Sequence, residues 1–156
     1  MSQFHLVDAI DLARAYVAAD YAVDLGTAWQ PVQVGAGAAD LEIAWPAPSY
    51  AFITAWNPAS LPRGERENRD ADARLCTRLD EAGAGRTPMR AQDARGAWLE
   101  PGWLVGGLDA DAIDALAREF GQAGVLFWER ASPVRLRMLL TPPRNRPDLP
   151  CVDWVE

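Results

Sequence analysis

The chain has 156 residues, 49% of them hydrophobic, and a net charge of −7, a composition that suits one soluble globular domain. An acidic surface repels phosphate backbones and anionic lipids, so the charge argues against nucleic acid and membranes as partners. All 15 basic residues are arginine, which excludes chemistry that needs a lysine Schiff base or a P-loop lysine.

The first third of the chain predicts one helix and three strands. Apolar residues at helical spacing predict a helix over residues 7–19. Residues 21–26 and 41–45 are predicted as strands, the second because Leu41, Ile43 and Trp45 alternate with polar or small residues, and residues 30–40 between them are predicted as a loop. Residues 49–56 are apolar at successive positions, which is typical of a central strand covered on both faces.

The rest of the chain predicts two helices among further strands. One helix covers residues 65–82, and a second begins after Asp109, a good N-cap residue, and ends at Gly121. The turn and break signals in the segment 87–107 divide it into two strand segments. Two more strands are expected in residues 124–130 and 133–140.

From about residue 50 to 130 the expected order is strand, helix, strand, strand, helix, strand. This order predicts an α/β (α+β) fold with a ferredoxin-like βαββαβ core, in which helices pack mainly on one face of an antiparallel or mixed sheet. The N-terminal helix and two strands would extend it. We treat residues 1–156 as a single domain, with a core over about 6–141 and a Pro-rich C-terminal tail over 142–156.

Several kinds of site lack the residues that they need. His5 is the single histidine, and Cys76 and Cys151 lie far apart in sequence, so we expect no catalytic Ser-His or Cys-His pair, no metal and no cofactor. The N-terminal sequence does not resemble a signal peptide, and no apolar run is long enough to cross a membrane. These features favour a cytoplasmic protein with reduced thiols.

Polar side chains gather where the central strand gives way to the next helix. Thr54 and Asn57 lie at the end of the central strand. The start of the next helix is surrounded by Arg63, Glu65, Glu67, Asn68 and Arg69, and Arg63 or Arg69 would offer charge. Strand ends and helix N-termini often form ligand sites because free backbone N–H groups collect there. The same residues could instead form a turn at Asn57 and a solvated helix start.

Two further polar residues stand in apolar surroundings. Glu100 lies between Trp98 and Trp103, where a carboxylate needs a partner unless its pKa rises. A raised pKa would suit a general acid or base, and an arginine or backbone N–H partner would make Glu100 structural. Gln122, between a helix end and a strand, fits either a core amide or a ligand contact.

Four tryptophans fall on expected strands. Aromatic side chains on an open sheet face can stack on RNA bases, but few basic residues lie among these four. Core packing or a homodimer interface is the better interpretation. The four are Trp56, Trp98, Trp103 and Trp128.

Four motifs carry a family resemblance: "FITAWNPAS", "EN" at Glu67 and Asn68, "GAWLEP" and "LAREFGQAGVLFW". Together they resemble a bacterial family, domain of unknown function 3293, over about residues 14–130. The resemblance brings no established activity, and the chain departs from the family pattern at Ala91, Gly102 and Ala123. It places the family's pattern on Thr54, Asn57, Pro58, Asn68, Trp98, Glu100, Phe120 and Gln122.

The leading interpretation is a domain that binds a small polar molecule, or a polar segment of a partner protein, in a pocket at the strand–helix junction. We expect Asn68→Ala to abolish binding while leaving the fold intact. One alternative is a metal-independent hydrolase or transferase with Glu100 as general acid or base. The other is a homodimeric protein-interaction module.

Overall fold

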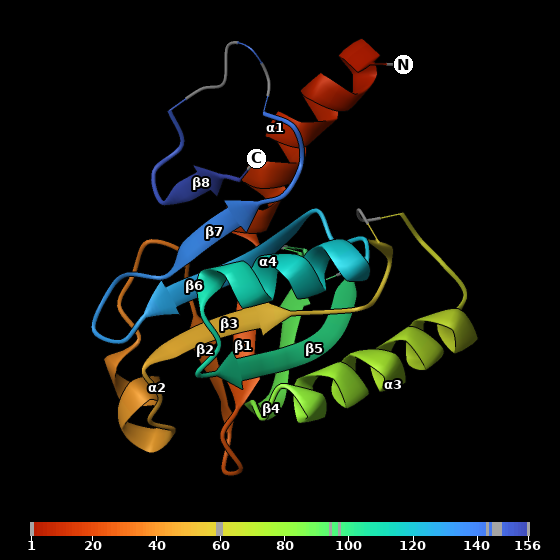
Figure 1. Cartoon of the computed structure of the whole chain (residues 1–156). Helices are drawn as coiled ribbons and strands as arrows, with labels where there is room; N and C mark the ends of the chain where they lie inside the picture. Colours follow the sequence, from red (N-terminus) through yellow and green to blue (C-terminus); the bar gives the residue numbers. More distant parts are fainter. Residues whose placement is uncertain are drawn as a thin grey trace.

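The computed structural model describes residues 2–58, 61–93, 95–96, 98–142, 144 and 148–155, with side chains from residue 9 onward. It contains four helices and eight strands in these parts of the chain (Figure 1). In chain order they are α1 (Ser2–Ala18), β1 (Asp20–Asp24), β2 (Trp29–Val32), α2 (Ala39–Ala44), β3 (Ser49–Ile53), α3 (Glu65–Glu81), β4 (Gly85–Gln92), β5 (Leu99–Gly106), α4 (Ala110–Glu119), β6 (Gly124–Glu129), β7 (Arg135–Met138) and β8 (Val152–Trp154).

The eight strands form one mixed sheet in the order β2-β1-β4-β5-β3-β6-β7-β8. Neighbouring strands are antiparallel except β7 and β8, which are parallel. β8 comes from the Pro-rich tail, so part of that tail is an edge strand. The division into a core and a tail within one domain stays a prediction.

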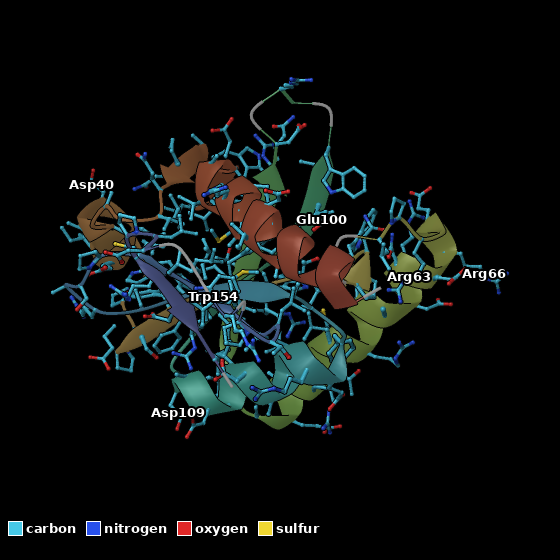
Figure 2. The ribbon with its side chains drawn as sticks, turned by 90° about the horizontal axis from the view of Figure 1, so that it is seen from above. Asp40, Arg63, Arg66, Glu100, Asp109 and Trp154 are labelled. Carbon is cyan, nitrogen blue, oxygen red and sulfur yellow. The ribbon has the colours of Figure 1, made fainter. Side chains whose placement is uncertain are left out.

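The sheet is strongly curved. Tyr21 on β1 and Phe52 on β3 meet edge to face with ring centroids 5.8 Å apart. Because β4 and β5 lie between these strands, a flat sheet would separate β1 from β3 by roughly 14 Å. The side chains therefore converge inside a half-barrel, and α1 lies over its concave face (Figures 1 and 2).

Both faces of the sheet carry a hydrophobic core. Ala13 of α1 and Leu41 of α2 belong to the core on the concave face. Leu75 of α3 and Ile113 of α4 belong to the core on the convex face. Every residue of β3 is buried, as expected for a central strand with two covered faces.

The predicted ferredoxin-like fold with helices mainly on one face is wrong. The expected order of elements is present between Ser49 and Glu129, but these four strands are the middle of an eight-stranded sheet. α1 and α2 cover the face opposite α3 and α4, because alternate residues such as Tyr50 and Phe52 make a second apolar face that must also be buried. The mixed content of helices and strands was predicted correctly.

Two local predictions are also wrong. Residues 41–45, expected as a strand, fall largely in helix α2, where Leu41 is buried and Ile43 is 74% exposed. Alternation had put these two residues on one face, whereas a helix turns them apart. Within the stretch expected as a loop, β2 pairs with β1. Among the described residues, no helix is long and apolar enough to cross a membrane.

Candidate functional site

A reciprocal pair of amides holds the loop between β3 and α3. The backbone N–H of Asn57 donates to Oδ1 of Asn68 at 3.0 Å, and Nδ2 of Asn68 donates to Oδ1 of Asn57 at 2.9 Å. Both residues are buried, and Asn57 has a φ of 43°, a left-handed conformation that asparagine tolerates better than most residues. The pair thus fixes the turn that ends the central strand.

Arg63 completes this amide–guanidinium cluster of Asn57, Arg63 and Asn68. Its Nε donates to Oδ1 of Asn68 at 3.0 Å, and its Nη2 donates to the carbonyl oxygen of Ala55 at 2.9 Å. Its backbone N–H donates to Oδ1 of Asn57 at 3.0 Å. The guanidinium is therefore turned into the loop and stabilises it.

The charged residues of the first turn of α3 lie outside this cluster. Glu67 is exposed, and its side chain makes no hydrogen bond with any described residue. Arg69 forms an exposed salt bridge with Glu65 at 2.6 Å. The structure therefore does not bring these residues to a common site with Asn57 and Asn68, and their position fits the solvated helix start considered from the sequence.

Glu100 connects the cluster to the concave face of the sheet. Its Oε1 accepts hydrogen bonds from Nδ2 of Asn57 at 3.2 Å and from the Trp98 indole at 3.0 Å. No described residue donates to Oε2. Burial raises the pKa of Glu100, and the hydrogen bonds from Trp98 and Asn57 oppose that shift.

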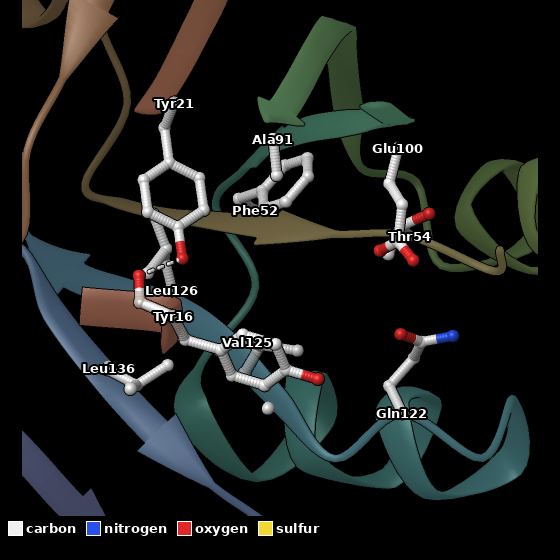
Figure 3. A pocket seen from close by; sticks show the side chains of 11 residues that line it. Tyr16, Tyr21, Phe52, Thr54, Ala91, Glu100, Gln122, Val125, Leu126 and Leu136 are labelled. Carbon is white, nitrogen blue, oxygen red and sulfur yellow. Dashed lines mark hydrogen bonds between the residues drawn. The ribbon is translucent and has the colours of Figure 1, made fainter. Parts of the chain in front are cut away.

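Thr54 and Gln122 lie close to Glu100, and the three side chains line the same cavity (Figure 3). The Thr54 hydroxyl donates to the carbonyl oxygen of Pro101 at 2.7 Å and accepts from the backbone of Trp56. Nε2 of Gln122 donates to the carbonyl oxygen of Trp56 at 3.1 Å, which leaves Oε1 of Gln122 without a donor among the described residues. Both side chains thus fix the end of β3 and also line a cavity.

The cavity has a narrow inner part and a wide outer part, which we call the inner and outer hollow. The inner hollow, of about 40 Å³, is bounded by Thr54, Glu100 and Gln122 together with apolar side chains. The outer hollow, of about 340 Å³, opens between α1 and the β4–β5 hairpin. Residues lining the outer hollow are Leu12, Ala15, Tyr16, Ala19, Tyr21, Ala91, Gln92, Asp93, Trp98 and Glu100.

Two tyrosines of this cavity were not predicted from the sequence. Tyr16 and Tyr21 flank the short turn between α1 and β1, and the Tyr21 hydroxyl donates to the Tyr16 carbonyl oxygen (Figure 3). Burial raises the pKa of Tyr21. The nearest signal in the sequence was the predicted N-terminal helix, whose place on the sheet depends on long-range packing.

The seven predicted site residues therefore divide into three groups. Thr54, Glu100 and Gln122 line the cavity; Asn57, Arg63 and Asn68 support Glu100 from behind; Glu67 takes no part. No group of three or more possible metal ligands occurs in the described parts of the chain. The fold and the cavity define a mixed α/β domain with a half-buried carboxylate, Glu100, in a mainly apolar hollow.

Residues 53–125 match the model of a family described as "Protein of unknown function (DUF3293)". The matched segment runs from the end of β3 into β6 and contains all seven predicted site residues, and the match confirms the family resemblance seen in the motifs. No curated protein and no solved structure matches the chain.

Proposed function

We propose that this protein binds a small molecule carrying a hydrogen-bond donor, in the cavity between α1 and the β4–β5 hairpin. Glu100 would accept the donor, and Gln122 and Thr54 would surround the inner end. The observation that carries the proposal is the Glu100 carboxylate, whose Oε2 has no donor from the described residues although the side chain lines a hollow of about 340 Å³.

The energetic argument concerns the unused carboxylate oxygen. Glu100 is half-buried, and its Oε2 still reaches the solvent of the hollow, because no buried side-chain oxygen of the described residues lacks a hydrogen-bond partner. A ligand that displaces this solvent must supply a donor, since removing a charged oxygen from water without a partner costs free energy. Glu100 accepts two hydrogen bonds, and both end on Oε1. A ligand donor at Oε2 would offset this cost, and the apolar wall would contribute through burial of the ligand's surface.

The location of the pocket differs from the one expected from the sequence. The polar groups at the start of α3 bond to one another, so they are not available to an anionic ligand. Both cysteines, Cys76 and Cys151, are free thiols. Reduced thiols are typical of the cytoplasm, where we place the protein as part of this proposal.

A thermal-shift screen of nucleotides, amino acids and sugar phosphates tests the proposal. We expect a ligand at about 100 times its Kd to stabilise the wild type by about 2.7 kcal/mol and to stabilise Glu100→Gln much less. Glu67→Gln, a matched change on an exposed glutamate, should respond as the wild type does. Equal stabilisation of all three proteins would place the site elsewhere, and no stabilising ligand would count against the proposal.

An enzymatic role is a second candidate, favoured by the environment of Glu100. Acid–base catalysis at a site that includes the Asn57 amide requires the two groups in contact, and they are 3.2 Å apart. Burial also raises the pKa of Glu100, as in many general acids. Turnover of any ligand from the screen by the wild type, and none by Glu100→Gln, would favour catalysis over simple binding.

Self-association is a third candidate, favoured by the convex face near β2, β4 and β5. Trp29 is 41% exposed and Leu99 is 51% exposed there. Together with Trp56 and Trp103, these two residues line a hollow of about 350 Å³ that is separate from the inner and outer hollow. Apolar patches of this kind often mark interfaces. Light scattering that finds a dimer in the wild type and a monomer in Leu99→Ser would support this role, and monomer alone at high concentration would contradict it.

A further inference from the structure

We infer that the ligand of this cavity is a cation, namely a protonated amine attached to an apolar or aromatic body. The inference rests on the proposed function and narrows it to one chemical class. It follows from three properties of the lining residues: the sign of their charge, their aromatic rings, and the small apolar side chains of α1.

The charged residues that line the outer hollow are both acidic. Glu100 of β5 lines the outer hollow and also the inner one, Asp93 follows β4 in the hairpin turn, and no described arginine is among the residues that line the outer hollow. The nearest arginine in the hydrogen-bond network, Arg63, reaches Glu100 only through Asn57 and directs its guanidinium to Ala55. A partly buried site with acidic groups only attracts cations and repels carboxylates and phosphates.

Aromatic side chains line the same hollow. The Trp98 indole is tied to Oε1 of Glu100 at 3.0 Å, so this ring stays beside the acceptor. Tyr16 and Tyr21 also line the hollow, and the Tyr21 hydroxyl is already bonded to the Tyr16 carbonyl oxygen. A cation near a carboxylate gains further stabilisation from aromatic faces within about 6 Å.

The wall opposite the hairpin accommodates an apolar group. It consists of Leu12 and Ala15 of α1 and of Ala19 directly after α1, and Ala91 lines the hollow from β4 of the hairpin. The three alanine side chains leave the space that a larger residue would fill. A ligand with an amine at one end and a phenyl or alkyl group at the other therefore matches the cavity along its length.

The test compares three probes of similar size: phenethylamine, 2-phenylethanol and 3-phenylpropanoate, with binding measured by calorimetry near neutral pH. We expect the amine to bind at least tenfold more tightly than the alcohol, and the carboxylate not to bind. Glu100→Gln should weaken amine binding at least tenfold and alcohol binding by a smaller factor, whereas Glu67→Gln should bind the amine as the wild type does.

A second variant keeps the test independent of Glu100. Ala15 is exposed on α1 and lines the hollow, so Ala15→Phe should fill the space without disturbing the core, and amine binding should be lost. Equal binding of amine and alcohol, or tighter binding of the carboxylate, would overturn the inference. If no probe binds but the thermal-shift screen yields a ligand at Glu100, the cationic class is wrong and the binding function stands. If neither experiment finds a ligand, both proposals fail.

Discussion

Replacing Asn68 with alanine tests the role of the amide–guanidinium cluster most directly. The sequence led us to expect that Asn68→Ala would spare the fold, but the contacts give the opposite expectation. Asn68 is 2% exposed, and its Oδ1 accepts from the Asn57 backbone and from Arg63. Truncation would remove both bonds and also the donor to Oδ1 of Asn57.

The cost can be worked out bond by bond. The buried N–H of Asn57 would lose its only acceptor among the described residues, which costs about 1–3 kcal/mol. The other two bonds contribute about 0.5–1.5 kcal/mol each, because Oδ1 of Asn57 keeps the Arg63 N–H and Arg63 can reach water. Alanine regains up to about 0.7 kcal/mol through its helix propensity. We expect a net loss of about 3 kcal/mol in the free energy of unfolding.

Urea unfolding, followed by circular dichroism, measures this loss. The midpoint should fall while the slope of the free energy with urea stays constant, and the melting temperature should fall by roughly 6–12 °C. Gln33→Ala is a matched truncation of an exposed amide that makes no hydrogen bond with the described residues, and it should change stability by less than about 0.5 kcal/mol. If Asn68→Ala were as mild as this control, the cluster would not stabilise the loop and the reasoning would be refuted.

Three further predictions concern single contacts. A Cβ on Gly102 would lie 2.5 Å from the Ile53 carbonyl oxygen, so Gly102→Ala should cost at least about 1–3 kcal/mol in urea unfolding, whereas Gly37→Ala, with open space around it, should not. Glu42 is 5% exposed and accepts hydrogen bonds from two N–H groups. Glu42→Gln would point its amide NH₂ at one of these N–H groups, so it should lower the free energy of unfolding by about 1–3 kcal/mol in the same assay. The raised pKa of Glu100 means that the native state holds its proton to higher pH than the unfolded chain, so the free energy of unfolding should fall as pH rises above the usual 4.5. Relative to Glu100→Gln, that fall cannot exceed about 1.4 kcal/mol per pH unit, and it should stop above the native pKa.

Each of these predictions has a contrary outcome. Gly102→Ala with wild-type stability would mean that β3 and β5 can separate without cost. An unchanged stability of Glu42→Gln would mean that α2 docks without its hydrogen bonds to β6 and to the turn after β6. Parallel stability curves for the wild type and Glu100→Gln between about pH 4 and pH 8 would show that the Glu100 carboxylate is solvated in the native protein.

Local signals predicted the elements on the convex face of the sheet well. The expected cap at Asp109 is present, with its carboxylate accepting from the Ala112 backbone at 2.8 Å. The helix expected over residues 65–82 is α3, from Glu65 to Glu81. These signals lie within a few residues of the element that they define, so one sequence contains them.

The concave face depends on contacts between distant residues. Glu42 accepts from the indole of Trp128 and from the backbone of Ala131, which docks α2 and favours a helix where alternation suggested a strand. Likewise, α1 comes beside Glu100 only because the sheet curves, and that curvature does not follow from the alternation of any single strand. Sequence reasoning therefore predicted Glu100 as a candidate but missed Tyr16 and Tyr21, which line the cavity with it.

Strand alternation explains why the polar residues serve two different purposes. Glu100, Gly102 and Leu104 occupy alternate positions of β5 and therefore share one face of the sheet. This is the concave face beside α1, because Leu104 belongs to the core on that face and a Cβ on Gly102 would contact the Phe52 ring of the same core. The loop after β3 crosses the end of the sheet, so Asn57 reaches the same carboxylate from the side of α3. Asn68 therefore acts on the cavity through Asn57, by fixing the orientation of Glu100, while Glu100 itself faces the space where a ligand would bind. The amide–guanidinium cluster that stands out in the sequence thus supports Glu100, which lies 43 positions after Asn57, whereas the cavity itself is lined by Thr54, Glu100 and Gln122.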